Sequence, residues 1–197
     1  MKVLKKIRKF REDPLIIFSM LIGLLYVTAL FLSKKAILGK NIKIIGSILI
    51  DLRSGSLLDI ADGVLLRSRN RGYHGVINSR IKLMCDENAK ITIGANTRFY
   101  GSCIHSSSSI TIGERCLVAS NVQIFDRNGH NSNFINPQNR INTYGKIKEV
   151  IIGNDVWIGT GVVITPGSII PDGSIIMANS VVSGVFKNKS LIGGVPA

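Results

Sequence analysis

The sequence predicts an all-β fold, a parallel β-helix, on three observations. First, an apolar residue occupies every sixth position near the C-terminus: Ile152, Ile158, Ile164, Ile170, Ile176 and Val182. Second, the positions four residues later hold mostly Val or Ser: Val156, Val162, Ser168, Ser174, Ser180 and Phe186. Third, aromatic residues make up only 6% of the chain, which suits short stacked strands better than a helical bundle. A strict six-residue period is typical of stacked β-helix coils.

The same period can be followed towards the N-terminus. It holds at Ile42, Ile48, Ser54 and Ile60, resumes at Ile93 and Phe99, and continues one residue out of phase at Ile112, Val118 and Ile124. Residues 67–80 between these stretches are basic and poorly periodic, so we expect a loop there. Three hexapeptides make a coil of about 18 residues, and coils are stable only when stacked. The sequence therefore predicts a β-helix domain over residues 40–197.

One long interruption breaks the period, over residues 125–150. The spacing from Ile124 to Ile152 is about ten residues longer than one coil, and the segment contains the turn-forming residues Asn, Gly and Pro. We expect a protruding loop, and a loop held on a rigid solenoid is a common place for a functional site.

Residues 1–39 form a separate, basic and apolar segment. Six of the first eleven residues are basic, and Pro14–Ser33 contains no charge, enough for a helix of ~30 Å. Lys34 and Lys35 follow where a signal peptide would have a small-x-small cleavage site. Basic flanks on both sides favour association with the cytoplasmic face of the inner or plasma membrane without crossing it. A spanning helix and a helix packed against protein are the alternatives, the latter in a cytoplasmic protein.

The net charge of +13 predicts an anionic partner, such as a membrane surface, a nucleotide cofactor or an acidic saccharide. No nucleic-acid-binding motif accompanies this charge, so no nucleic-acid partner is expected. The three cysteines are an odd number without paired spacing, which argues against a disulfide framework. Cys103 and Cys116 both stand four residues after an apolar repeat position, so we expect both to point into the core as small residues.

Three segments together resemble a known family. They are Ile112-Gly-Glu-Arg-Cys-Leu-Val-Ala-Ser-Asn-Val-Gln-Ile124, Asp126-Arg-Asn-Gly-His130 and Ile152-Gly-Asn-Asp-Val-Trp157-Ile-Gly159. They look like the left-handed β-helix acyltransferases, in particular the maltose, galactoside and O-antigen or capsule O-acetyltransferases. The resemblance implies a left-handed helix, a homotrimer with active sites between subunits, acetyl-CoA as donor, and no metal. The acceptor it implies is a hydroxyl or an amine.

The resemblance also assigns the site residues. His130 matches the catalytic base, a role that suits an imidazole at neutral pH. Asp126 would orient that ring, or else form a turn. The residues expected to contact CoA are Trp157, Thr160, Ala178, Ser183 and Lys187. Ser102 and His105 are candidates for contact with the acceptor, and Ser102 stands where galactoside-type relatives carry an Asn, which argues against a simple galactoside or maltose acceptor.

We therefore expect an O-acetyltransferase that acts on a saccharide of envelope, O-antigen or capsule assembly, with a lipid-linked acceptor as one option. The alternatives are an N-acetyltransferase of an amino-sugar nucleotide and a xenobiotic acetyltransferase. A γ-carbonic-anhydrase-like metal hydratase requires three His ligands, and this chain has only His74, His105 and His130, widely spaced. A non-catalytic β-helix scaffold is the fourth hypothesis.

Overall fold

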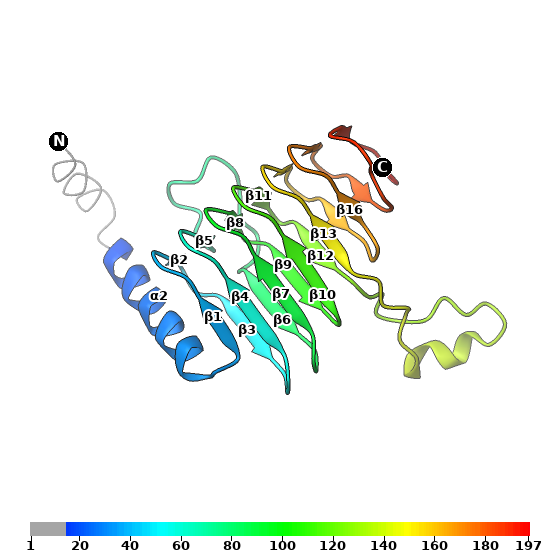
Figure 1. Ribbon diagram of the computed structural model, residues 1–197, viewed down its shortest axis with the longest axis horizontal. Helices are drawn as coiled ribbons and strands as arrows, with labels where there is room; N and C mark the ends of the chain where they lie inside the picture. The colour runs from blue at the N-terminus through cyan, green and yellow to red at the C-terminus, as the bar shows by residue number, and fades with distance from the viewer. Residues whose placement is uncertain (1–14) are drawn as a thin grey trace.

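The computed structural model describes residues 15–197, and its main body is a parallel β-helix with three sheets (Figure 1). Sheet A contains β1 (Ala36–Leu38), β4 (Leu57–Ile60), β7 (Lys90–Ile93), β10 (Ser109–Ile112), β13 (Val150–Ile152) and β16 (Ile169–Ile170). Sheet B contains β2 (Lys43–Ile45), β5 (Leu65–Arg67), β8 (Arg98–Tyr100), β11 (Leu117–Ser120), β14 (Trp157–Ile158), β17 (Ile175–Ile176) and β19 (Leu191–Ile192). Sheet C contains β3 (Leu49–Leu52), β6 (Lys82–Cys85), β9 (Cys103–Ser106), β12 (Gln123–Phe125), β15 (Val163–Ile164) and β18 (Val181–Val182). Up to β18, the chain visits sheets A, B and C in turn, so each coil adds one parallel strand to each sheet.

The six-residue period lines the inside of this helix, which confirms the predicted fold class. Ile152 pairs with Ile170, and Ile158 pairs with Ile176, so stacked positions are one coil apart. The side chains at these positions are at most 1% exposed. The serines of the second register also point inward, and the Ser168 hydroxyl donates to the Thr165 carbonyl at 2.8 Å. A buried hydroxyl of this kind is tolerated because it is hydrogen-bonded.

At one corner the side-chain directions depart from the six-residue period, and the expected inward direction of Cys103 is wrong. At the bend from β8 to β9, Ser102 and Ile104 point inward while Cys103 is half-buried on the outer face of sheet C. The register between β8 and β11 is irregular here, because Tyr100 pairs with Ser120 and Ala119 has no partner. The corner is thus one residue shorter than the next, which turns Cys103 outward. Cys85 and Cys116 are buried, and burial raises the pKa of the Cys85 thiol to about 12.

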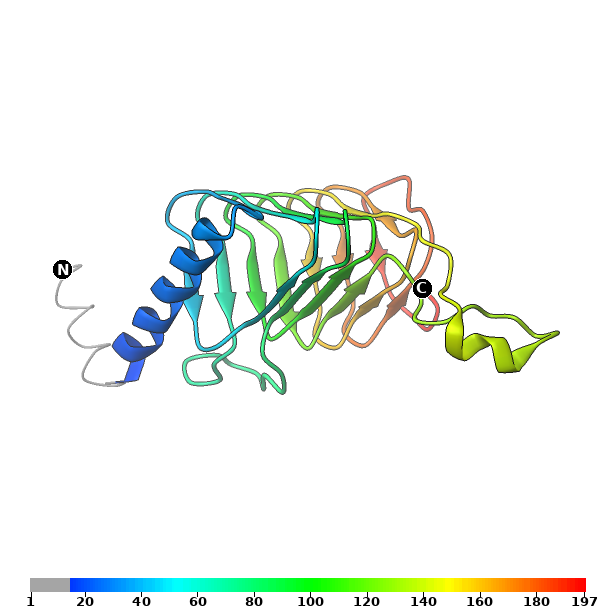
Figure 2. The same ribbon diagram turned by 90° about the horizontal axis from the view of Figure 1, so that it is seen from below.

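The N-terminal helix α2 (Leu15–Leu32) lies at one end of the β-helix, against β2 and β1 (Figures 1 and 2). The first strand, β1, begins at Ala36, a few residues before the expected domain start. No helix among residues 15–197 is long and apolar enough to cross a membrane. The basic residues expected to precede α2 lie outside the described residues.

Two loops leave the body. The first joins β5 to β6, where a basic loop was expected, and it has defined contacts: the Asn70 amide donates to the Ile77 carbonyl at 3.1 Å, and the Tyr73 ring stacks on Tyr100 with centroids 4.4 Å apart. The second joins β12 to β13, spans residues 126–149, and projects away from the β-helix in both views (Figures 1 and 2). We call residues 126–149 the arm.

The arm has an antiparallel stem and a short helical tip. In the stem, the Lys148 amide donates to the Asp126 carbonyl at 2.8 Å, and the Gly145 amide donates to the Asn128 carbonyl at 3.2 Å. Near the tip, η1 (Pro137–Asn142) forms a 3₁₀ helix. The stem hydrogen bonds mean that the position of the arm is set at its base, where it meets sheets A and C.

Candidate functional site

His130 lies on the stem of the arm and is exposed. Its Nδ1 atom is 2.7 Å from the carbonyl oxygen of Arg140. A carbonyl can only accept, so Nδ1 carries the proton, and in the neutral ring Nε2 keeps its lone pair. Arg140 is itself fixed, because its Nε donates to the Asn133 carbonyl at 2.9 Å. The arm therefore presents an imidazole whose tautomer suits a general base at Nε2.

Asp126 does not orient this imidazole, which corrects the expected pairing. Its side chain is fully buried, at 0% exposure. Oδ1 accepts from the Ser107 amide at 2.7 Å, while Oδ2 accepts from the Ser108 and Ser109 amides at 2.8 Å and from the Ser106 hydroxyl at 2.9 Å. The carboxylate thus closes the serine turn, residues 106–109, beneath the arm. The Arg140 carbonyl takes the orienting role at His130.

A second carboxylate, Asp86, ties the arm to the coil below it. Arg127, at the base of the arm, donates from Nη2 to Asp86 Oδ2 at 2.8 Å, and the Ser107 hydroxyl donates to the same oxygen at 2.7 Å. His105 Nε2 is 3.3 Å from that oxygen. The Arg127 guanidinium also stacks over the Tyr144 ring, 4.3 Å from its centroid. His105 is therefore part of the ion-pair cluster at the base of the arm.

The pKa of Asp86 follows from these contacts. Burial alone would raise it, but the hydrogen bond from Ser107, the nearby His105 ring and the charge of Arg127 outweigh burial, so the pKa is lowered from its ordinary value. A carboxyl whose pKa is lower in the folded state stabilises the fold above its unfolded pKa, and this stabilisation is lost as the pH falls through the folded value.

We therefore predict that the melting temperature falls as the pH is lowered below about 4. Asp86→Asn removes the titrating group, so the variant should be less stable at neutral pH and should lose less stability on acidification. Melting curves of both proteins across this pH range test the prediction. Parallel curves for the two proteins would contradict it.

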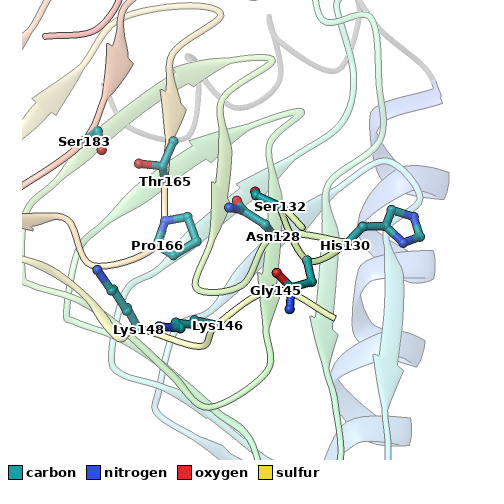
Figure 3. Close-up of a pocket in the computed structure, with 10 residues that line it drawn as sticks. Asn128, His130, Ser132, Gly145, Lys146, Lys148, Thr165, Pro166 and Ser183 are labelled. Carbon is teal, nitrogen blue, oxygen red and sulfur yellow. The ribbon is translucent and has the colours of Figure 1, made fainter. Parts of the chain in front are cut away.

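A cavity of about 450 Å³ lies between the arm and the later coils (Figure 3). The residues that line it are Asn128, His130, Asn131, Ser132, Gly145, Lys146, Lys148, Thr165, Pro166 and Ser183. The two lysines come from the arm, and Thr165 and Ser183 come from successive coils. Figure 3 shows the His130 ring turned away from Thr165 and Ser183. Within one chain, the imidazole therefore does not face the far wall of this cavity.

Only Ser183, of the residues expected to bind CoA, lines this cavity. Trp157 lies on the outer face of sheet B, 53% exposed, between Leu117 and Ile175 of the neighbouring coils. Thr160 and Ala178 lie at the corner that follows, where the Thr160 hydroxyl bonds to Ser120 at 2.8 Å. In a single chain, the residues expected to bind CoA therefore lie in two places. Ser183 lies at the cavity, whereas Trp157, Thr160 and Ala178 lie on sheet B and its following corner.

Ser102 corrects another expectation. It is 1% exposed, and its hydroxyl lies within hydrogen-bonding distance of the Tyr100 and Ala119 carbonyls, so it offers no atom to an acceptor. Thr165 was not among the expected residues, although it stands one coil before Ser183 and shares its wall. Lys187 is exposed. Within residues 15–197, no group of three or more His, Cys, Asp or Glu is placed to hold a metal ion.

Comparison with known proteins identifies the family to which this β-helix belongs. Residues 149–184 match a family model described as bacterial transferase hexapeptide (six repeats). A maltose O-acetyltransferase from Clostridium difficile 630 is 30% identical, with a TM-score of 0.52, over 75% of this chain and 67% of that protein. The chain belongs to the hexapeptide-repeat acyltransferases. As in that family, the β-helix is left-handed.

Two further hexapeptide-repeat acetyltransferase structures are similar. One, from Vibrio cholerae O1 biovar eltor, is complexed with acetyl-CoA and is 28% identical with a TM-score of 0.51, over 60% of this chain and 65% of that one. The other, a galactoside acetyltransferase in complex with coenzyme A, is 28% identical with a TM-score of 0.55, over 70% and 60% of the two chains. This chain thus spans less than two thirds of these two proteins. No curated protein sequence matches it.

Proposed function

We propose that the protein transfers an acetyl group from acetyl-CoA to a hydroxyl of a saccharide. The observation that carries the proposal is the Nδ1 contact of His130 with the Arg140 carbonyl, which leaves Nε2 as a base on an exposed arm. Family membership supports it, since two similar structures hold acetyl-CoA or coenzyme A. The similar maltose and galactoside enzymes support a saccharide as the acceptor class.

The reaction follows from this geometry as a direct transfer. Nε2 of His130 removes the proton of the acceptor hydroxyl as its oxygen attacks the thioester carbonyl. The tetrahedral oxyanion that forms needs hydrogen-bond donors, which backbone amides of the neighbouring coils can supply. Collapse of this intermediate breaks the carbon–sulfur bond, and the imidazolium returns its proton to the leaving thiolate.

The cavity beside the arm suits part of the acetyl-CoA molecule. Lys146 and Lys148 place two ammonium groups at its edge, which favours an anionic, phosphate-bearing ligand. Ser183 and Thr165 provide hydroxyls on the opposite wall. Trp157, Thr160 and Ala178 form a second set of candidate contacts on sheet B and its following corner, and Lys187 is a further exposed candidate.

A homotrimer accounts for the separation of these two groups. The arm tip exposes Phe134, Ile135 and Ile141, each at least 76% exposed, and sheet B exposes a column of Leu117, Trp157 and Ile175. Exposed apolar side chains that gather in this way favour a contact with another protein surface. We propose that the arm reaches a second copy of the chain, where His130 faces that copy's acetyl-CoA site.

The proposed acceptor is a saccharide used in envelope polysaccharide assembly, O-antigen or capsule, in a lipid-linked form. The apolar helix α2 next to basic residues supports a site of action at the cytoplasmic face of the membrane. An acceptor held at that surface would meet the enzyme in two dimensions, which raises its effective concentration.

The test is mass spectrometry of a saccharide pool incubated with acetyl-CoA and the purified protein. We expect a product heavier by one acetyl group, and we expect mild alkali to remove that group, since esters hydrolyse more readily than amides. An alkali-stable product would instead indicate N-acetylation of an amino sugar. Acetylation of antibiotics without any saccharide product would favour the xenobiotic enzyme.

A further inference from the structure

Helix α2 carries a broad apolar surface on the side away from the β-helix. We call this surface the outer face of α2, and its side chains are 55–72% exposed: Phe18, Leu21, Leu24, Leu25, Phe31 and Leu32. No residue of the helix is charged. An exposed apolar face of this kind indicates a surface that another apolar phase covers.

The opposite side of α2 is fixed to the protein. Leu30 is 7% exposed and joins the core, and Tyr26 and Val27 pack against that core. At Gly23 a Cβ atom would lie 2.5 Å from the Ile44 carbonyl oxygen, so only glycine allows the helix to lie this close to β2. Since one stripe is docked along the end of the β-helix, the direction of the outer face is set by the fold.

Basic residues stand on both sides of α2 in the sequence. Lys34, Lys40 and Lys43 are exposed where the chain leaves α2 and enters the first coil. The loop between β5 and β6, which carries the exposed Arg80, lies on the same side of the body as the N-terminal end of α2 (Figures 1 and 2). In the sequence, six further basic residues precede the helix within the first eleven positions. In the sequence, the apolar helix is thus flanked by basic residues on both sides.

We infer that the outer face of α2 lies flat in an anionic lipid bilayer, at the boundary of headgroups and acyl chains. The apolar side chains would enter the acyl region, while the lysines and arginines would bind anionic headgroups. The docked stripe keeps the helix parallel to the end of the β-helix, so the enzyme sits on the membrane as one rigid body. A second copy of the chain would satisfy the apolar side chains but not the surrounding charge. The inference does not depend on acetyl transfer and can fail while that function stands.

The experiment is flotation of the full-length protein with vesicles of phosphatidylcholine, with and without phosphatidylglycerol, at low and high salt. We expect binding that requires phosphatidylglycerol and weakens with salt, because headgroup attraction is screened. Leu21→Glu with Leu25→Glu should lower vesicle binding about tenfold or more. Replacement of Lys34, Lys40 and Lys43 by Gln should reduce the preference for phosphatidylglycerol.

The control is Leu49→Glu, which adds one glutamate at an exposed apolar position of sheet C, outside the outer face of α2. It should bind vesicles as the unchanged protein does, and melting curves establish that all variants are folded. Vesicle binding unaffected by Leu21→Glu with Leu25→Glu would overturn the inference. Absence of vesicle binding in the unchanged protein would also overturn it. Dissociation of an oligomer by the same pair, without an effect on lipid, would assign the outer face to a second copy.

Discussion

Replacement of His130 by Ala is expected to lower kcat for acetyl transfer by about 100-fold or more. General-base catalysis contributes about 10²–10⁴-fold, and Nε2 of His130 is the nitrogen that the Arg140 carbonyl leaves unprotonated. The KM for acetyl-CoA should change little, because the proposed role of the imidazole is to remove a proton from the acceptor hydroxyl and not to bind coenzyme A. Steady-state kinetics with a saccharide acceptor and a thiol assay measure both constants.

The matched control is His74→Ala, a second exposed histidine, which lies in the loop before β6. Its ring lies against the ring of Tyr73, with the two centroids 4.5 Å apart. This variant should keep the kcat of the unchanged protein, and both variants should show the same oligomer size. If the His130→Ala protein kept nearly full kcat, His130 would not be the general base. Another residue would then serve as the base, or the arm would have no catalytic role.

The β-helix itself could be predicted because its period records side-chain direction. Each inward-pointing position recurs one coil later. The sequence alone therefore predicts that Ile152, Ile158 and Ile164 point inward, without any knowledge of the turns. The arm was predictable for the same reason, since extra residues between two inward positions have to leave the body. A local change in the number of residues at one corner of the β-helix is harder to detect. The short corner at Gly101 turned Cys103 outward and buried Ser102, and the sequence period alone does not say which corner lost a residue.

The orienting role expected of Asp126, for which a role in a turn was the alternative, was inferred from its short distance in sequence from His130. His130 stands four positions after Asp126, which suggested a contact. The strand period was the better guide: Ile124 points inward on β12, so Asp126, two residues later, also points inward. A buried carboxylate requires donors, and four consecutive serines at the stacked corner of the coil below supply them. The contact between His130 and Arg140 could not be anticipated, because it depends on how the tip folds back.

Asp126→Ala is expected to destabilise the protein by about 3 kcal/mol or more. The substitution removes the carboxylate that accepts from the buried Ser106 hydroxyl and from the part-buried amides of the next three serines, and a hydrogen bond to a charged group contributes about 1.5–3 kcal/mol. The loss should lower the melting temperature. It should also reduce kcat, since the serine turn and Arg127 together set where the arm leaves the body. Thermal and urea denaturation measure the stability.

Two variants separate this role from a general effect of removing a carboxylate. Asp126→Asn keeps one acceptor oxygen but turns an amide N–H₂ towards amide donors, so it should lie between Asp126→Ala and the unchanged protein. Glu114→Ala removes an exposed carboxylate that pairs with Arg115 at 2.7 Å, and an exposed ion pair contributes at most about 1 kcal/mol. If Asp126→Ala were no more destabilised than Glu114→Ala, the serine turn would hold its shape without the carboxylate, and the arm would be positioned by Asp86 and Arg127 alone.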